Sequence, residues 1–269
     1  MAKRHRLDEE LVEQGFFHTR EEAMRAVLAG EVSTTDRRLE SAGEQVLPGI
    51  ALHVRGRTPY VSRGGLKLER GLDAFRVDPA GLACLDVGCS TGGFTDCLLS
   101  RGAKSVLAVD VGYAQFDWTL RQNHRVTLLE RTNIVDVPTP ERVGTIQLAV
   151  CDVSFTSVIT VLPAVLELLE TDGAFLTLVK PQFEAARDEV GEGGVVRDES
   201  VRLEALRRVA EAFSEAGLGP VACCQSPVRG HKGNVEYLLL GQRGFAPTAL
   251  DLERVVSEGA VVDARGALS

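Results

Sequence analysis

The sequence predicts an α/β protein, in which a doubly wound, mostly parallel sheet follows a small separate unit at the N-terminus. From about residue 60, short apolar runs alternate with amphipathic helical stretches, as in a parallel sheet covered by helices. One of these apolar runs, CLDV, breaks into a glycine-rich turn. The chain has 269 residues, which leaves room for one large domain and a small one.

The composition is that of an ordinary globular protein, with 44% hydrophobic and 25% charged residues. No apolar run approaches the ~18 residues of a transmembrane helix, and the opening MAKRHRLDEEL lacks the apolar core of a secretory signal. Six cysteines without a repeating spacing indicate reduced thiols, not a disulfide framework or a zinc site. We therefore expect a cytoplasmic protein without a bound metal.

The formal net charge of -8 is unevenly spread. Residues 1–70 have a balance of +1, with 12 Lys and Arg against 11 Asp and Glu, whereas residues 71–269 have a balance of -9. Bulk charge governs solubility and steering, while binding of an anion depends on where the cations lie. The first quarter is therefore the part least repelled by a nucleic acid, and its candidate cations are Lys3, Arg4, Arg6, Arg20, Arg25, Arg37 and Arg38.

The first part of the chain predicts two short helices. Apolar residues at helical spacing begin the first helix at Leu7, and Gly15 ends it. Thr19 is the expected N-cap of the second helix, with Glu22 three residues later completing a capping box, and Gly30 closes it. A polar, turn-rich stretch follows.

Strands and helices alternate along the rest of the chain, and in such sheets ligands bind beyond the carboxyl ends of the strands. After residue 244, apolar residues at helical spacing predict one more helix that packs on the domain. The candidate strands are 50–54, 83–87, 105–109, 126–130, 146–151, 173–179, 218–224 and 235–240. The candidate helices are 65–75, 93–101, 114–122, 157–169 and 199–215.

The glycine turn after the first of the alternating strands fits no phosphate-binding fingerprint. A dinucleotide motif requires a second glycine where the chain has Ser90, and a P-loop requires a lysine where it has Phe94. The pattern that remains, D-x-G-x-x-x-G-G, resembles the first motif of the Rossmann-like S-adenosylmethionine methyltransferases, whose turn receives a cofactor without phosphates. The resemblance implies cofactor contacts at Asp86, Gly88, Ser90, Thr91, Gly92 and Gly93.

Two further residues are candidates for the cofactor site. Asp110 ends the next strand, 22 residues after Gly88, where an acid accepts hydrogen bonds from ribose hydroxyls in dinucleotide folds. A helix cap is an equally good interpretation of Asp110 taken alone. Asn133, after the third strand, is a candidate contact on the adenine side, with a simple turn asparagine as the alternative.

The acceptor of a methyl group follows by elimination. Amine-methylating enzymes have D/N-P-P-Y/F after the fourth strand, where this chain has CDVSF, and Cys151 suits a buried thiol better than a nucleophile. A hydroxyl acceptor remains, and it needs a base. Lys180 ends the apolar strand AFLTLV at the ligand-bearing rim, where a second cation would favour its neutral form, and Asp152 ends its own strand nearby. The alternative is that both are rim residues that only meet water.

A set of longer motifs resembles the TlyA family of ribosomal RNA 2′-O-methyltransferases over residues 4–241. They are YVSRGGLKL, DVGCSTGGFTD, AVDVGYAQ, LERTN, CDVSF, LVKPQFE, GGVVRD and GNVEYLL. The resemblance implies a class I S-adenosylmethionine methyltransferase fold with a mostly parallel seven-stranded sheet. It also implies a catalytic tetrad of Lys67, Asp152, Lys180 and Glu236. In this tetrad Lys180 is the base, Lys67 keeps it reactive, and the two acids orient the lysines and the target ribose; Asp152 also belongs to the expected cofactor contacts.

The N-terminal segment resembles the small alpha-L RNA-binding motif of a ribosomal assembly protein. Its usual continuation V-x-V-N-G is absent, since the chain reads EVSTTDRRL, and a helical packing module without RNA contact is the alternative. The implied domains are 1–54 for RNA binding, 55–60 as a linker, 61–244 for methyl transfer and 245–269 as a tail. The implied RNA contacts are Arg4, Arg6, Arg20, Arg25, Arg37 and Arg63.

The expected function is therefore methyl transfer from S-adenosylmethionine to the 2′-hydroxyl of a cytidine in ribosomal RNA of one or both subunits. Two alternatives remain at this point. One is a non-catalytic RNA-binding assembly factor, and the other is a haemolysin-like membrane-active protein, a label that family members have carried. The sequence does not determine the oligomeric state.

Overall fold

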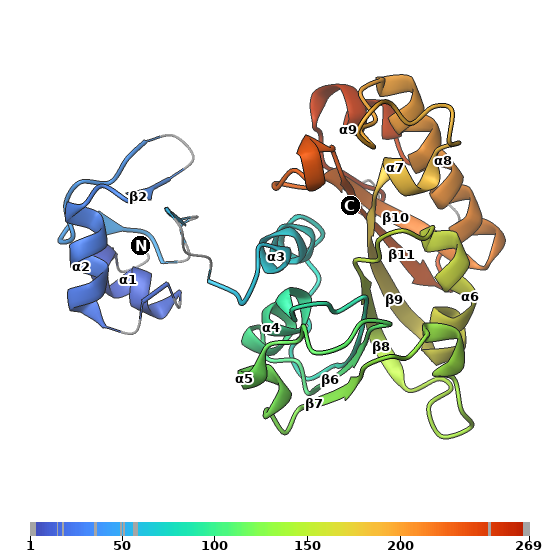
Figure 1. Ribbon diagram of the computed structural model, residues 1–269, viewed down its shortest axis with the longest axis horizontal. Coiled ribbons are helices and arrows are strands. Elements are labelled where there is room, and N and C mark those ends of the chain that lie inside the picture. The colour runs from blue at the N-terminus through green and yellow to red at the C-terminus, as the bar shows by residue number, and fades with distance from the viewer. Residues whose placement is uncertain are drawn as a thin grey trace. The chain divides into compact units, whose positions relative to one another are not determined.

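The computed structural model divides the chain into two compact units, residues 1–63 and 64–269 (Figure 1). The residues that the structure describes are 4–14, 16–17, 19–34, 37–48, 50, 52–55, 59–246 and 249–265. The expected helix stop at Gly15, the turn at 35–36 and residues 56–58 of the expected linker lie outside these residues. No helix among the described residues is long and apolar enough to cross a membrane.

The N-terminal unit is a small α+β module with two helices and two short antiparallel ribbons. Strand β1 pairs with β3, and β2 pairs with β4. Thr19 caps α2 as expected, because its Oγ1 accepts a hydrogen bond from the backbone N–H of Glu22 at 3.3 Å. The elements are β1 (His5–Arg6), α1 (Leu7–Glu13), α2 (Arg20–Leu28), β2 (Val32–Ser33), β3 (Gln45–Val46) and β4 (His53–Val54).

This unit has a core of its own. Both helices turn one apolar stripe inward, so that Leu7 and Leu11 of α1 meet Ala23 and Val27 of α2 in a single buried cluster. Burial of these side chains stabilises the module by about 1.5–3 kcal/mol for each large one.

The larger unit is built on an eight-stranded sheet in the order β12-β10-β11-β9-β8-β5-β6-β7. The five strands from β9 to β7 run parallel to one another, while β11 and β12 are antiparallel to their neighbours. The strands are β5 (Ala83–Val87), β6 (Ser105–Val109), β7 (Val126–Leu129), β8 (Ile146–Cys151), β9 (Leu169–Val179), β10 (Leu218–Gln225), β11 (Tyr237–Arg243) and β12 (Val262–Asp263). The expected mostly parallel α/β sheet is therefore confirmed.

Helices cover both faces of this sheet (Figure 1). On one face lie α3, α4 and α5, and on the other lie α6, α7, α8 and α9. Their bounds are α3 (Gly64–Ala74), α4 (Gly93–Ser100), α5 (Trp118–Arg121), α6 (Val158–Leu168), α7 (Pro181–Glu184), α8 (Glu199–Glu215) and α9 (Leu252–Glu258), with 3-10 turns η1 (Ile134–Asp136) and η2 (His231–Gly233). The expected tail helix is thus present as α9, and its Val255 is fully buried.

The structure differs from the sequence-based expectation at several places in the sheet unit: for example, β9 begins at Leu169 and not at 173, and β11 begins at Tyr237 and not at 235. The helix expected over 114–122 is reduced to Trp118–Arg121, because Ala114 has a left-handed φ of 59° and its N–H donates to the Glu130 carboxylate. Asp117 then begins the helix by accepting a hydrogen bond from the N–H of Thr119 at 2.8 Å. The described sheet also has β12 as an eighth strand beyond the seven expected.

Candidate active site

The candidate residues meet where the carboxyl ends of the parallel strands β5, β8 and β9 adjoin the amino end of the antiparallel β11. Val87 at the end of β5 pairs with Cys151 at the end of β8, and Cys151 pairs with Thr177 of β9. Val179 at the end of β9 pairs with Tyr237, the first residue of the antiparallel β11. The residues just beyond these ends therefore share one rim of the sheet: Gly88, Asp152, Lys180 and Glu236.

The glycine turn lies directly against the strand end that contributes Asp152. The backbone N–H of Asp152 donates to the carbonyl of Val87 at 3.0 Å. Gly88 has a φ of 78°, and a Cβ atom there would lie 2.9 Å from the carbonyl oxygen of Asp152. Both the backbone conformation and the close approach thus require glycine.

Asp86 is a fully buried carboxylate beneath the turn. Its Oδ2 accepts a hydrogen bond from the hydroxyl of Thr95 at 2.6 Å, while Oδ1 is buried with no hydrogen-bond partner among the described residues. Burial raises the pKa of Asp86 to about 7, although the hydrogen bond from Thr95 opposes the rise. An unsatisfied buried carboxylate oxygen is rare in native proteins and indicates a site for a polar or cationic group.

Asp110 joins two loops of the rim through both of its carboxylate oxygens. Oδ2 accepts from the backbone N–H of Ser90 at 2.7 Å and Oδ1 from that of Gly112 at 2.6 Å. The carbonyl of Thr91 accepts from the N–H of Asp117 at 3.1 Å, which ties the same two loops together. The turn and the loop after β6 therefore form one preorganised wall.

Asn133 performs the simpler of the two roles considered for it. Its Oδ1 accepts a hydrogen bond from the backbone N–H of Val135 at 3.3 Å and so begins the 3-10 turn η1. Its side chain remains exposed beside the end of β7. A contact with the cofactor's adenine side stays a prediction.

Lys180 is held at the rim by two oxygen acceptors. Its Nζ lies 2.6 Å from Oδ1 of Asp152 and donates to Oγ of Ser154 at 2.7 Å. The side chain is only 9% exposed, because Pro181 starts α7 immediately after it and turns the chain over the rim. The structure thus brings together the two residues that sequence reasoning selected.

Lys67 and Glu236 form a second buried ion pair at the same rim. Lys67 lies on α3, which packs against β11, and its Nζ donates to Oε2 of Glu236 at 2.6 Å. The Glu236 carboxylate fits closely against the backbone of Gly230, where a Cβ atom would lie 2.0 Å from Oε1. These residues are 169 positions apart in the sequence, so their pairing is visible only in the fold.

The thiols of the rim are unsuited to nucleophilic catalysis. Cys151 is fully buried, and burial raises the pKa of its thiol to about 12. Since the thiolate is the nucleophilic form, this residue is inert at neutral pH. Methylation of a base carbon through Cys151 is therefore disfavoured, in agreement with the prediction from its strand pattern.

Two functional candidates at this rim were missed from the sequence, Ser154 and Phe155. Ser154 contacts Lys180 directly, as described above. Phe155 is 92% exposed and has a φ of 64°, which is a strained backbone conformation for an aromatic residue. Its ring lies 5.4 Å from that of Phe183. The signal was available in the CDVSF motif, where an aromatic residue follows the strand end at the place where amine methyltransferases have one.

The candidate RNA contacts belong to the N-terminal unit, residues 1–63, and most are surface residues. Arg25 and Arg63 are exposed. Arg4 donates to the carbonyl of Gln45, Arg37 pairs with Glu44, and Arg6 and Arg20 share the carboxylate of Asp8. Their role in RNA binding stays a prediction.

The sequence model of the FtsJ-like methyltransferase family matches residues 60–243. The chain belongs to this family. Within it, the chain belongs to the TlyA group, because it is 43% identical over 268 residues to the TlyA protein of Mycobacterium tuberculosis, named a 16S/23S rRNA (cytidine-2′-O)-methyltransferase. That match covers 96% of this chain and 100% of the relative.

Two other relatives of the TlyA group have names of a different kind. Hemolysin A of Brachyspira hyodysenteriae is 38% identical, over 87% of this chain and 98% of its own. A solved structure described as a hemolysin from Streptococcus thermophilus is 37% identical, has a TM-score of 0.72 and covers 96% of both chains.

The cofactor of this methyltransferase family is S-adenosylmethionine, and the residues of the rim fit it. The turn has no lysine for phosphates, since Phe94 takes that place and is buried in α4. The free oxygen of Asp86 suits a cationic amino group. The chain is thus a methyltransferase with an intact candidate cofactor site.

Proposed function

We propose that this chain, acting in the cytoplasm, methylates the ribose 2′-hydroxyl of cytidine in ribosomal RNA. The single observation that carries the proposal is the Lys180–Asp152 pair, 2.6 Å apart, at the strand end that touches the glycine turn. It puts a basic side chain next to the expected position of an activated methyl group. The name of the M. tuberculosis relative supports the ribosomal and cytidine parts of the proposal.

The chain's own residues supply the proton chemistry. S-adenosylmethionine, when bound, supplies a methyl group on a sulfonium, so the bond from sulfur to carbon breaks as the ribose oxygen forms its bond to that carbon. Lys180 in its neutral form accepts the proton of the 2′-hydroxyl at Nζ as this bond forms. Asp152 and Ser154 fix the position of Nζ, and the resulting ammonium is stabilised by the same carboxylate.

Lys67 and Glu236 complete the site as a second charged pair. In this proposal Lys67 helps to keep Lys180 reactive, and Glu236 holds Lys67 in place through the ion pair at 2.6 Å. For the cofactor we propose Asp86, the turn from Gly88 to Gly93, and Asp110. The N-terminal arginines hold the RNA by its phosphates, because phosphate and shape contacts dominate the recognition of structured RNA.

The proposal is tested by locating the methyl group that the enzyme transfers. Ribosomal subunits that lack the modification are incubated with enzyme and methyl-labelled S-adenosylmethionine, and the RNA is then hydrolysed in alkali. A 2′-O-methyl group protects its phosphodiester bond, so label in alkali-resistant dinucleotides that contain cytidine is the expected result. Label in single nucleotides released by alkali would place the methyl group on a base and overturn the proposal. Bound cofactor without transfer to any RNA would favour a non-catalytic assembly factor.

A further inference from the structure

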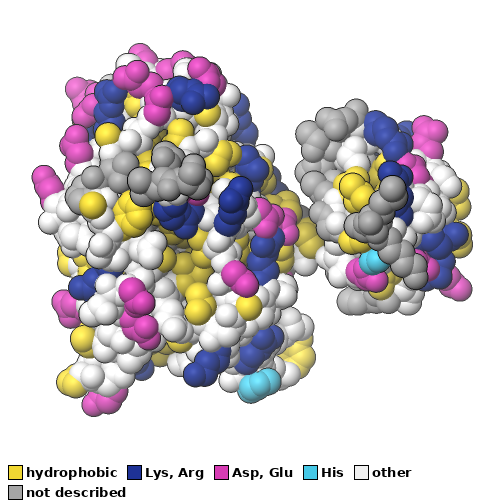
Figure 2. Space-filling model, turned by 180° about the vertical axis from the view of Figure 1, so that it is seen from behind, with side chains coloured by type: hydrophobic (Ala, Val, Ile, Leu, Met, Phe, Trp, Pro, Cys, Tyr) yellow, Lys and Arg dark blue, Asp and Glu magenta, His cyan; other side chains and the backbone are white. Residues whose placement is uncertain are grey.

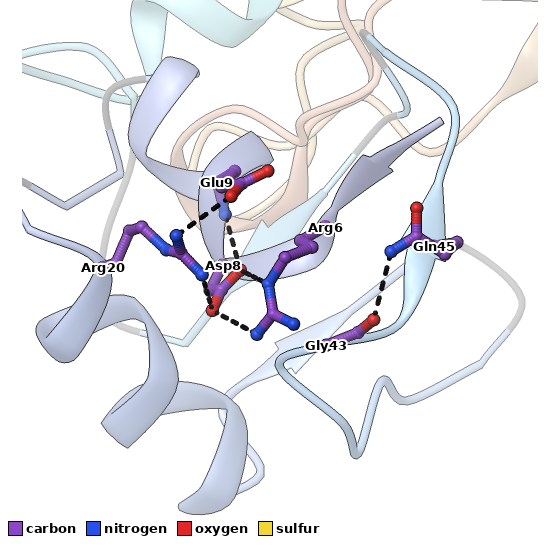
Figure 3. A network of polar contacts seen from close by, with 6 residues as sticks. All are labelled: Arg6, Asp8, Glu9, Arg20, Gly43 and Gln45. Carbon is purple, nitrogen blue, oxygen red and sulfur yellow. Dashed lines mark hydrogen bonds and ion pairs between the residues drawn. The ribbon is translucent and has the colours of Figure 1, made fainter. Parts of the chain in front are cut away.

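Asp8 is a buried carboxylate that two surface arginines share (Figure 3). The residue is 2% exposed and lies in the first turn of α1. Its Oδ1 accepts from Nε of Arg6 at 3.0 Å, and its Oδ2 accepts from Nη2 of Arg6 at 2.9 Å and from Nη2 of Arg20 at 3.2 Å. The Arg6 contact is thus bidentate, which fixes the plane of the guanidinium as well as its position.

The two arginines come from different secondary-structure elements, and their spacing in the sequence alone would not bring them together. Arg6 ends β1, and Arg20 begins α2, fourteen positions later in the sequence. Asp8 itself is fixed by its backbone N–H, which donates to the carbonyl of Ala42 at 3.0 Å. The shared carboxylate therefore brings together two cations that are far apart in the sequence, and Glu9 also holds Arg20, with its Oε1 3.0 Å from Nη1.

Both guanidiniums keep surface available for a ligand. Their side chains are 42% and 52% exposed, although each also contacts Asp8. A guanidinium has five N–H donors, and Arg6 uses two of them on Asp8. The hydrogen bond from Arg6 is the main cause that lowers the pKa of Asp8, so the carboxylate remains charged at neutral pH.

The net negative charge of the chain does not favour binding of a nucleic acid. Its net charge is -8, and Figure 2 shows Lys and Arg side chains scattered over the visible face, with acidic side chains among them. Affinity for a polyanion must then come from cations that are already correctly oriented. Preorganised side chains lose less conformational entropy when they bind.

We propose that Asp8 is a positioning residue for RNA binding, which holds Arg6 and Arg20 as a paired clamp for the phosphates of the RNA backbone. This inference rests on the proposed function, because it assumes that RNA is the substrate. Asp8 does not touch the RNA and acts through the two arginines.

The decisive variant is Asp8→Asn, for which two accounts predict opposite results. The substitution removes a negative charge, so simple electrostatics predicts tighter binding of RNA. Positioning predicts weaker binding, by about tenfold, as expected for the loss of one or two charge-assisted phosphate contacts. The matched control is Glu13→Gln, which removes one negative charge from the exposed end of the same helix and is expected to leave binding equal or slightly tighter.

The full-length enzyme is titrated with a ribosomal RNA fragment at several salt concentrations. The slope of log affinity against log salt is expected to become shallower by about one to two for Asp8→Asn. Methyl transfer at saturating RNA is expected to keep its kcat while the KM for RNA rises. In an Arg6→Ala, Arg20→Ala background, Asp8→Asn is expected to have no further effect on binding, whereas a merely structural role would persist.

The possible failures are distinguishable. If the wild type binds RNA with a normal salt slope and Asp8→Asn behaves like Glu13→Gln, the clamp is wrong while the proposed function stands. If the wild type neither binds nor methylates ribosomal RNA, the proposed function fails and the inference fails with it. Should Asp8→Asn not fold, the Arg6→Lys, Arg20→Lys double variant keeps both charges and loses the fork geometry. If that double variant binds the RNA fragment with wild-type affinity, the proposal of a paired arginine clamp is wrong.

Discussion

At the scale of single residues, Asp86 links the cofactor site to pH. Its pKa is raised by burial to about 7, whereas an unfolded chain has the ordinary value of 3.8. The folded state therefore binds the proton more tightly, so the stability contribution of Asp86 is full below about pH 4 and is lost as pH rises to 7.

We expect the free energy of unfolding of the cofactor-free wild type to fall relative to Asp86→Asn between pH 4 and 7. Urea unfolding of both proteins across this range measures the difference. The asparagine side chain of the variant changes the free energy of unfolding by an amount that does not depend on pH. The test therefore compares only how steeply the free energy of unfolding of each protein changes with pH. Saturating S-adenosylmethionine should flatten the wild-type curve, because a cation beside Asp86 favours its charged form. Parallel curves without cofactor would contradict the account.

Phe155 is a second residue whose conformation points to function. A φ of 64° is strained for a residue with a Cβ, at a cost of order 1–3 kcal/mol, and the ring is still 92% exposed. Its neighbour Phe183 lies with its ring 6.0 Å from Nζ of Lys180. The strained backbone therefore holds an exposed ring against Phe183, which lies beside the proposed base, and we expect an RNA base to stack on Phe155.

For Phe155→Ala we expect roughly 10- to 100-fold lower kcat/KM for RNA, which is the range for loss of one stacked base. The affinity for S-adenosylmethionine, measured by calorimetry, should stay unchanged. Phe155→Trp should retain most activity, and Phe155→Gly should unfold at a higher temperature than Phe155→Ala because the strain is relieved. Full activity of the alanine variant on ribosomal RNA would exclude the stacking role.

At the scale of elements, the loop that ends at β11 determines where Glu236 lies. A Cβ atom at Gly230 would lie 2.0 Å from Oε1 of Glu236, so the carboxylate must move if the glycine is replaced. We expect Gly230→Ala to lose methyl transfer to the same extent as Glu236→Gln, while cofactor binding remains. Single-turnover rates of the two variants, measured side by side, test this equality. A Gly230→Ala enzyme of wild-type rate would show that the Lys67–Glu236 pair is not needed.

The segment just after the C-terminal strand β12 contacts the end of α3. Arg265 donates to the carbonyl of Phe75, just after α3 ends, and it also pairs with Asp263 at 2.8 Å. Cations near the last carbonyls of a helix stabilise its end. Since Lys67 lies on α3, we expect this contact of the tail to stabilise the helix that carries Lys67.

We expect Arg265→Ala to lower the free energy of unfolding by about 1 kcal/mol, and to reduce the rate of methyl transfer more than the affinity for RNA. Arg254→Ala is the matched control, because the side chain of that arginine forms an exposed pair with Glu258 on α9, and its loss should change the free energy of unfolding by at most ~0.5 kcal/mol. If the two variants have the same free energy of unfolding and the same rate of methyl transfer, the contact of Arg265 with the end of α3 has no particular importance.

At the scale of the whole molecule, local patterns predicted the sheet well and its long-range pairs poorly. Strand bounds followed from apolar runs, and the N-cap of α2 followed from Thr19 and Glu22. The helix predicted over 114–122 is wrong because Glu130, just after the next strand, accepts a hydrogen bond from the backbone N–H of Ala114. The strand β12 was missed because two residues give no periodic signal.

The candidate site shows the same division between local and distant information. Lys180 and Asp152 were visible from the sequence because each ends an apolar strand. Lys67 resembled an ordinary lysine on a helix face, and Glu236 an alternating strand residue, so only the family resemblance pointed to them. Their contact depends on the packing of α3 against β11, which no local pattern encodes.

The central claim is that Lys180 is the base for ribose methylation, and a single-turnover measurement tests it most directly. Wild type, Lys180→Ala and Lys104→Ala are each saturated with S-adenosylmethionine and mixed with ribosomal subunits that lack the modification. The account predicts a rate at least ~100-fold lower for Lys180→Ala, as for loss of a general base. Cofactor affinity should be unchanged, and the exposed control Lys104→Ala should keep the wild-type rate. A Lys180→Ala rate within a few-fold of wild type would contradict the account.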